Sequence, residues 1–205
     1  MARGATATRA PEATRRKILE AAFGEFYTNS FQGGSLNDIV AAAGTTKGAL
    51  FHHFTSKHDL GYAVLDDLIG PLLLERWLAG LEDTTDPLSE LQRTFRQHLS
   101  SDIGSGNFVH GCPLNNLAQE MSPLDEGFHV RINGLYDTWR GGVAAALERG
   151  IKAGSVKSTV HAANTAALIV AAQMGIWGSG KSSQRAEVMR AATEGLCSYL
   201  ESLRP

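Results

Sequence analysis

The side chains of this chain that are best suited to bind a polyanion lie close together in the sequence. They are two hydroxyl groups, two ammonium groups and one imidazole, contributed by Thr45, Thr46, Lys47, Lys57 and His52. Ammonium groups neutralise phosphates, and hydroxyl and imidazole groups hydrogen-bond to phosphates and to base edges. This combination favours contact with nucleic acid.

No set of residues in the sequence has the types and spacing of a catalytic site. We find no nucleophile paired with a base, no Cys/His spacing typical of zinc, and no cofactor loop at the required spacing. His52 and His53 form an apparent pair, but both lie within the polar cluster just described. We therefore expect no enzymatic activity, no metal and no cofactor.

Two short helices joined by a tight turn are expected to position the polar cluster. Ser35 stands at an N-cap position before an apolar helical repeat, and Gly44 supplies the left-handed conformation that ends a helix. A threonine at position 45 or 46 then caps a second helix, with Leu50 inward and Lys47 outward. A helix-turn-helix over about residues 35–54 inserts its second helix into the major groove, which is about 12 Å wide. The alternative interpretation is an ordinary helical hairpin inside an all-α core.

The segment resembles the DNA-binding domain of the TetR family of bacterial transcriptional repressors. The pattern of that family is matched, over about residues 14–60, by Ile39-Val40, Ala43-Gly44, Thr46, Lys47-Gly48, Phe51, His52-His53-Phe54 and Ser56-Lys57. The rest of the chain resembles the family in length and helical pattern. Phe51 departs from the tyrosine common at its position, so its ring offers apolar contact where the family has a hydroxyl group.

The resemblance implies a sequence-specific transcriptional regulator, most simply a repressor that a small-molecule effector releases from its operator. It implies DNA contacts by Ser35, Thr45, Thr46, Lys47, Gly48, Phe51, His52 and Lys57. A homodimer with two reading heads about one helical turn apart binds a near-palindromic operator. An activator or a ligand-independent regulator is also compatible with these residues. The alternative from another class is an all-α small-molecule-binding protein, enzymatic or not, with an incidental helix hairpin.

Composition is typical of a globular protein, and charge is unevenly distributed. The 205 residues carry a formal net charge of −2, and 43% of them are apolar. Residues 1–60 carry +2 and residues 61–205 carry −4, as expected for a DNA-reading domain followed by an acidic effector-binding and dimerisation domain. Two cysteines give no disulfide framework. With no signal peptide and no apolar run of the ~18 residues that a membrane helix needs, we expect a cytoplasmic protein without membrane contact.

Helical periodicity continues along the rest of the chain, so we predict an all-α fold of about nine helices. Besides the two of the helix-turn-helix, they cover about residues 12–27, 56–80, 88–103, 113–121, 124–153, 159–177 and 184–203. Gly70-Pro71 is expected to kink the long second one of these. Residues 1–11 are expected to be mobile. Gly178-Ser179-Gly180-Lys181-Ser182 is expected to form a loop, without the spacing of a nucleotide site.

The last two helices are rich in alanine and glycine, which let helices approach closely. In the family that this chain resembles, the equivalent helices pair with those of a second subunit, so the resemblance implies a homodimer. The middle of the chain combines aromatic, sulfur and amide side chains, which suits a small-molecule pocket and equally a helical core. The candidates for an effector pocket are Trp77, Phe95, His98, Cys112, Leu117, Phe128, Tyr136, Trp139, Gln173 and Trp177.

Cys112 is the most specific hypothesis for this pocket. The run Gly111-Cys112-Pro113-Leu114 resembles a segment of TetR-type repressors that sense electrophiles or short unsaturated acids. The cysteine is expected at a helix N-terminus, which lowers the pKa of a thiol and favours the thiolate. The alternative is a buried, inert cysteine that packs as a small hydrophobic residue, which is also our interpretation of Cys197.

Overall fold

The computed structural model describes residues 9–205, with side chains described from Pro11 onward. Of residues 1–11, for which mobility is expected, residues 1–8 lie outside the described part, and residues 9–11 are helical, so that the first helix begins earlier than predicted. The described residues are predominantly helical, and no strand occurs among them. The chain divides into two compact units. The first comprises the chain up to Pro71 together with Asn116–Ile132, and the second comprises Leu72–Asn115 and Asn133–Pro205.

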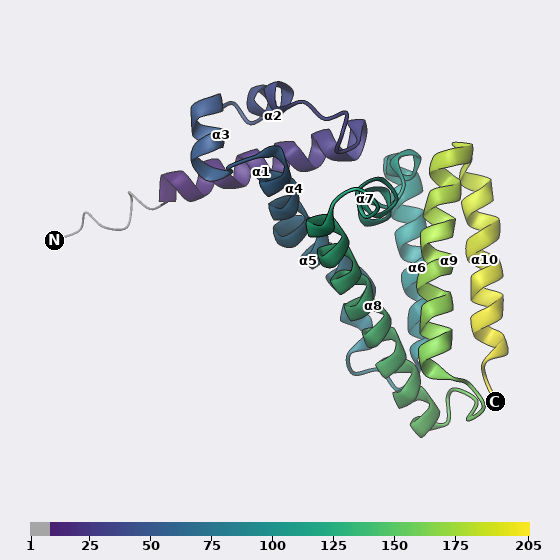
Figure 1. Ribbon diagram of the computed structural model, residues 1–205. Coiled ribbons are helices and arrows are strands. Elements are labelled where there is room, and N and C mark those ends of the chain that lie inside the picture. Colours follow the sequence, from purple (N-terminus) through teal and green to yellow (C-terminus); the bar gives the residue numbers. More distant parts are fainter. Residues whose placement is uncertain (1–8) are drawn as a thin grey trace. The chain divides into compact units, whose positions relative to one another are not determined.

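Four helices open the first unit (Figure 1). They are α1, Arg9–Asn29; α2, Leu36–Ala42; α3, Lys47–His53; and α4, Lys57–Val64. The hydroxyl oxygens of Ser35, Thr46 and Ser56 each accept the backbone N–H three residues on, at 3.3, 3.2 and 3.0 Å. Because each bond satisfies a donor that the first helical turn leaves unpaired, these caps set where α2, α3 and α4 begin.

The helix-turn-helix predicted by the sequence is present. Ile18 of α1, Ile39 of α2 and Leu50 of α3 are fully buried and form a shared core. Gly44, between α2 and α3, has a φ of +60°, a conformation that L side chains rarely adopt. The turn therefore needs glycine, as its position at the end of α2 indicates.

The helical run that begins with α4 changes its hydrogen-bond pattern before it ends. A π-helical turn, Leu65–Ile69, separates α4 from α5, Gly70–Leu78. The N–H of Gly70 donates to the carbonyl of Leu65, five residues earlier, and Pro71 has no N–H to donate. The structure thus has an irregularity directly before the predicted kink. The described part of the chain contains ten α-helices. If α4 and α5 are counted as one interrupted helix, there are nine, the number that the sequence predicts.

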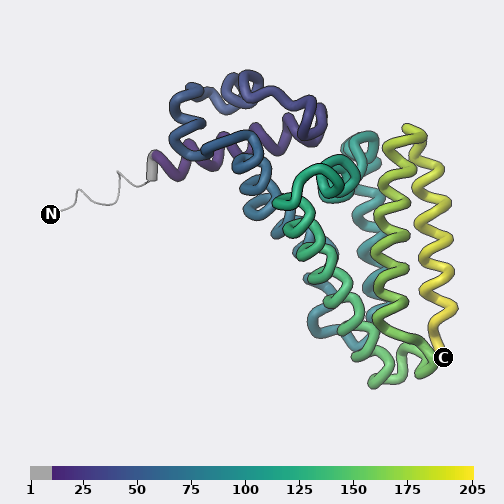
Figure 2. The backbone as a smooth tube through the Cα atoms, viewed as in Figure 1, coloured from purple at the N-terminus to yellow at the C-terminus, as the bar shows by residue number. Residues whose placement is uncertain are grey.

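Three long helices lie side by side in the second unit, and two of them, drawn in green and yellow, form a helical hairpin (Figure 2). They are α6, Pro87–Ser105; α9, Ala162–Ser183; and α10, Ala186–Ser202. Short 3-10 helices cover Ala79–Leu81 and Asn107–His110. Leu88, Leu91, Phe95 and Leu99 of α6 are buried, as their helical spacing predicts.

The remaining helices, α7 and α8, each contribute residues to both units. They span Pro113–Met121 and Glu126–Ala153. α8 begins two residues later than predicted because the carboxylate of Asp125 accepts the N–H of Phe128 at 2.9 Å, which is an N-cap geometry.

The segment Gly178–Ser182 is not the loop that its composition suggests, because α9 continues to Ser183. A Cβ atom at Gly180 would lie 2.2 Å from the sulfur of Met189, so glycine lets α10 pack closely here. The hydroxyl of Ser179 donates to the carbonyl of Gly175 at 2.8 Å and is thereby satisfied inside the helix. The chain turns only at Gln184, which has a φ of +55°.

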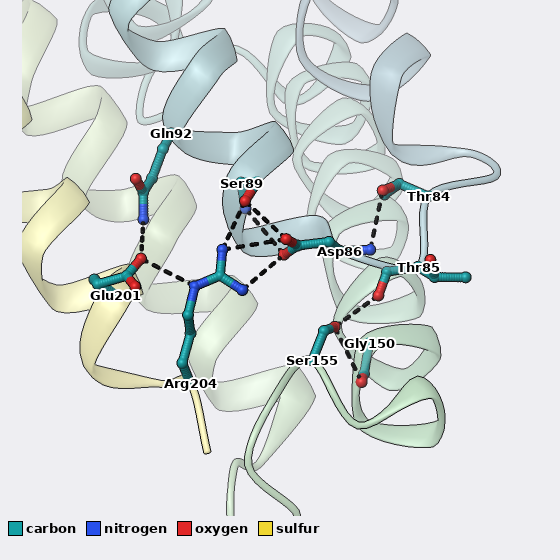
Figure 3. Close-up of polar contacts among 9 residues, drawn as sticks. All are labelled: Thr84, Thr85, Asp86, Ser89, Gln92, Gly150, Ser155, Glu201 and Arg204. Carbon is teal, nitrogen blue, oxygen red and sulfur yellow. Dashed lines mark hydrogen bonds and ion pairs between the residues drawn. The ribbon is translucent and has the colours of Figure 1, made fainter.

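The C-terminus is tied to the start of α6 (Figure 3). The guanidinium of Arg204 donates to both carboxylate oxygens of Asp86 at 3.1 and 3.2 Å, and to the hydroxyl of Ser89 at 2.6 Å. It also donates to Glu201 at 3.0 Å. Asp86 is itself the N-cap of α6. One arginine therefore joins segments that are more than 100 residues apart.

Candidate nucleic-acid interface and candidate ligand site

One face of α3 carries most of the residues for which DNA contact is predicted. The exposed side of this helix and its cap comprises Thr46, Lys47, Gly48, Phe51 and His52. Phe51 is 50% exposed, a high value for a large aromatic side chain. A short, exposed helix with small and polar residues at its N-terminal end has the dimensions that a major groove admits.

The hydroxyl groups of Ser35 and Thr46, beside this face, act as helix N-caps. Ser35 caps α2, and its backbone N–H donates to the carboxylate of Glu25 at 2.9 Å. Thr46 caps α3 with its oxygen, which leaves its O–H able to donate to a phosphate. Thr45 is partly exposed. DNA contact by these residues stays a prediction, and for Ser35 the structure supplies a different role.

Lys57 is engaged within the protein. Its ammonium group donates to the carbonyls of Gln32 and Gly34 at 3.1 and 2.6 Å and lies over the ring of Phe31 at 5.1 Å. Two of its three donors therefore hold the loop between α1 and α2. The predicted contact between Lys57 and a phosphate therefore has to use the third N–H donor of the ammonium group.

Glu120 of α7 holds the same loop from a distant point in the sequence. Its two carboxylate oxygens accept the backbone N–H groups of Phe31 and Gln32 at 2.9 and 2.8 Å. Lys57 and Glu120 together form what we call the loop clamp, with a cation on the carbonyls and an anion on the N–H groups. Sequence reasoning missed Glu120 because a lone glutamate 88 residues from Gln32 carries no local signal.

The basic residues of α1 beside this region are partly neutralised. Arg15 forms an ion pair with Asp67 at 2.7 Å, and Arg16 forms one with Glu20 at 2.8 Å. Burial, together with the nearby charges of His52 and Arg15, lowers the pKa of His53, so this ring is neutral at pH 7. Lys47 is the exposed basic residue at the N-terminal end of α3 itself.

Comparison with known proteins matches both parts of the chain. The model for bacterial regulatory proteins of the tetR family matches residues 18–64, and the model for the tetracyclin repressor-like C-terminal domain matches residues 87–196, more than half of the chain. The chain belongs to the TetR family. It is a DNA-binding helix-turn-helix regulator of transcription.

Relatives of this TetR-family chain include an uncharacterized HTH-type transcriptional regulator of Lactococcus lactis, 31% identical over 65% of this chain and 68% of the relative. The HTH-type transcriptional repressor DhaR of a Mycobacterium species is 27% identical over 70% of each chain. A solved TetR-family regulator from Agrobacterium tumefaciens superimposes with a TM-score of 0.81 at 25% identity, covering 95% of this chain and all of the other.

The predicted effector-pocket residues of the TetR-family chain separate into two groups. Leu117 and Phe128 belong to the first unit. There Phe128 packs against Phe31 and Tyr62, with ring centroids 4.8 and 4.9 Å apart. The structure therefore places Phe128 next to the loop clamp. The other eight residues belong to the second unit.

All three tryptophans of the chain meet in the second unit. Trp77 stacks on Trp139 with ring centroids 5.6 Å apart and meets Trp177 edge-on at 5.3 Å. Tyr136 stacks on the outer side of this group, 6.5 Å from Trp139, and Phe95 lies 5.5 Å from Trp77. We call these five aromatic residues the tryptophan cluster.

A charged pair lies beside the tryptophan cluster. One carboxylate oxygen of Asp102 accepts the guanidinium of Arg76 and the indole N–H of Trp177, each at 2.6 Å. His98 hydrogen-bonds through Nε2 to the carbonyl of Arg76 at 2.9 Å. Burial, followed by the charge of Arg76, lowers the pKa of His98, so its ring is neutral at pH 7 and donates that bond. Sequence reasoning named His98 but neither Arg76 nor Asp102.

Cys112 is buried in the second unit, with 6% of its surface exposed. Burial raises the pKa of its thiol, and the N–H groups of Asn115 and Leu114 at the start of α7 only partly oppose this effect. The helix N-terminus expected beside Cys112 is present, but desolvation of the thiolate outweighs it. The thiol form and the enclosure match the alternative of a packed cysteine. Cys197 is buried as predicted.

Two kinds of feature do not occur among the described residues of the TetR-family chain. No helix among them is long and apolar enough to cross a membrane. No group of three or more His, Cys, Asp or Glu side chains among them is placed to hold a metal ion.

Proposed function

We propose that this protein is a homodimeric repressor that binds a near-palindromic operator through α3 and leaves it when a small molecule binds in the second unit. The observation that carries the proposal is the exposed face of α3, where Lys47 and His52 stand beside small residues on a short capped helix. The similarity to DhaR, a transcriptional repressor, supports the direction of regulation.

An apolar surface on the helical hairpin supports the dimer. Leu168 of α9 is 50% exposed, and α9 and α10 border a groove lined by Leu168, Ala172, Gly175, Ile176, Ser179, Ala192, Leu196 and Tyr199. Small residues in the lining of this groove, Ala172, Gly175 and Ala192 among them, leave room for the helices of a second copy to approach closely. Two copies joined here present two α3 helices to one duplex.

Release by an effector requires that the effector bind the low-affinity arrangement of the dimer more tightly than the DNA-bound one. A differential affinity of about a hundredfold corresponds to a coupling free energy of about 2.7 kcal/mol, which lies in the usual range for allosteric proteins. The tryptophan cluster and its polar neighbours combine the aromatic and polar residue types that line small-molecule sites.

The proposal is tested by selecting bound sequences from a random duplex library at physiological salt. We expect recovery of one motif with two inverted half-sites, and an affinity for it that falls steeply with salt. Recovery of no motif by a folded, dimeric protein would contradict operator binding. A motif without inverted symmetry would contradict the dimer. The recovered operator then serves as the probe for effector release.

A further inference from the structure

We propose that the second unit binds an uncharged, ring-containing small molecule with at least one hydrogen-bond donor and one acceptor, held by Arg76, Tyr136 and Gln173 beside the tryptophan cluster. Binding itself is independent of the operator. Only the statement that this molecule is the effector rests on the proposed function.

Five buried side-chain polar atoms of the second unit have no hydrogen-bond partner in the described structure, and three of them belong to residues at or beside the tryptophan cluster. These three are the Nε of Arg76, the phenolic oxygen of Tyr136 and the Oε1 of Gln173. Gln173 is 1% exposed and Tyr136 is 7% exposed, so bulk water does not reach them. An unpaired polar atom in such surroundings costs stability, and a cluster of them indicates a site completed by another molecule.

Two of these residues contact indole rings of the cluster, and the third shares a helix face with one of the tryptophans. The guanidinium of Arg76 lies 5.3 Å from Trp77 and 5.9 Å from Trp177. Tyr136 stacks next to Trp139. Gln173 precedes Trp177 by one turn of α9, which places both on the same face of that helix. The unpaired atoms and the aromatic surfaces therefore belong to one region.

The charges of this region cancel. Arg76 is neutralised by Asp102 at 2.6 Å, and Arg140, which lies 5.9 Å from the ring of Tyr136, is paired with Asp137 at 2.7 Å. His98 is neutral at pH 7. Burial raises the pKa of Cys112 and of Tyr136, so neither carries charge at pH 7. An anion or a cation that entered would lose its hydration without gaining a counter-charge, whereas a neutral molecule avoids this cost.

The unpaired atoms also define the polar groups that the ligand must carry. The Oε1 of Gln173 only accepts, so it needs a donor, and the Nε–H of Arg76 only donates, so it needs an acceptor. The hydroxyl of Tyr136 serves either purpose. Flat indole faces favour a ring as the apolar part. Burial raises the pKa of the Cys112 thiol and so disfavours the nucleophilic thiolate, which favours non-covalent binding.

The test uses three probes of equal shape and different charge: benzamide, benzoate and benzamidinium. The full-length protein is titrated at pH 7.5 while tryptophan fluorescence is recorded, since every tryptophan of the chain lies in the cluster. We expect benzamide to change the emission with a Kd at least about tenfold below those of both ions. No saturable change with benzamide up to about 10 mM, or equal binding of benzoate, would overturn the proposal.

Two variants locate the site, and a third is the control. Gln173→Leu and Tyr136→Phe are each expected to weaken benzamide binding about tenfold, because each removes one hydrogen bond. Gln92→Leu makes the same change at a glutamine whose side chain bonds to Glu201 and Arg96 and to no residue of the cluster, and it should leave the affinity unchanged. Gln173→Leu should keep or raise the Tm, since it removes an unpaired buried oxygen. Unchanged benzamide affinity in both site variants would assign the binding elsewhere.

The operator recovered by selection separates this proposal from the proposed function. Release of the operator by benzamide, lost in Gln173→Leu, would support both. Binding of benzamide that leaves operator affinity unchanged would support the neutral ligand site and contradict its role as the effector site.

Discussion

At the scale of single residues, Lys47 and Lys57 have different surroundings despite identical side chains. Lys47 is exposed at the start of α3, whereas Lys57 holds two carbonyls of the loop before α2. The family motif contains both lysines and does not distinguish them. The role expected for each lysine follows from the contacts of its ammonium group within the protein.

We expect Lys47→Ala to weaken operator binding without changing stability, and Lys57→Ala to lower stability as well. Loss of one phosphate contact makes the slope of log K against log[salt] less negative by about 0.9. Loss of Lys57 leaves two carbonyls without their charged donor, which costs about 1.5–3 kcal/mol. Fluorescence anisotropy across a salt series and urea unfolding measure the two effects. An unaltered salt slope in Lys47→Ala would contradict the phosphate contact.

At the scale of elements, the loop between α1 and α2 depends on α7. Glu120 accepts two adjacent N–H groups of that loop, whereas Glu25 of α1 accepts the N–H of Ser35 at the end of the loop. The start of the DNA-reading helices is therefore defined partly by a helix from the middle of the chain.

Glu120→Ala is expected to loosen this loop and to lower the free energy of unfolding by about 2–3 kcal/mol, the value of hydrogen bonds to a charged acceptor. Amide hydrogen exchange should rise at Phe31 and Gln32 and stay unchanged at Leu99, in the core of α6. Glu120→Gln retains one acceptor and should show a smaller effect. Equal exchange in wild type and Glu120→Ala would show that the loop holds its shape without the clamp.

The packing of α9 on α10 gives a second prediction at this scale. Gly180→Ala places a Cβ against the buried Met189, whereas Gly134→Ala in α8 meets no atom within 4 Å. We expect the first to destabilise by about 1–3 kcal/mol through overpacking. The second should stabilise by up to about 1 kcal/mol, because alanine favours a helix over glycine. Thermal unfolding compares the two, and a gain in Tm for Gly180→Ala would refute the close helix contact.

At the scale of the whole molecule, stability is expected to fall with acidification in two stages. The pKa of His98 is lowered below its unfolded value of 6.5, so the unfolded chain binds this proton first and stability is lost as pH falls below about 6.5. The hydrogen bond from Arg96 lowers the pKa of Glu194, and that from Tyr62 lowers the pKa of Asp125. These carboxylates add a further loss below about pH 4.5.

Urea unfolding at a series of pH values measures both stages. His98→Gln retains a donor for the carbonyl of Arg76 but does not titrate, so it should flatten the first stage and leave the second. A first stage of unchanged size in this variant would assign it to other groups, including His53, whose pKa is lowered in the same direction.

Interactions between residues close in the sequence allowed the helix-turn-helix and the fold class to be predicted. The caps at Ser35, Thr46 and Ser56 and the turn at Gly44 each involve residues at most five positions apart, so their spacing predicts the helix-turn-helix and the family. Helical periodicity predicts the all-α class for the same reason.

Only the tertiary structure shows the features that depend on residues far apart in the sequence. Gly178–Ser182 is helical because α10 packs against it, the loop clamp joins positions 88 residues apart, and Phe128 packs near Phe31 rather than with the tryptophans. The state of Cys112 depends on its enclosure, which outweighs the helix N-terminus that its sequence position predicts. Burial and long-range pairing are properties of the assembled chain, so no pattern of nearby residues contains them.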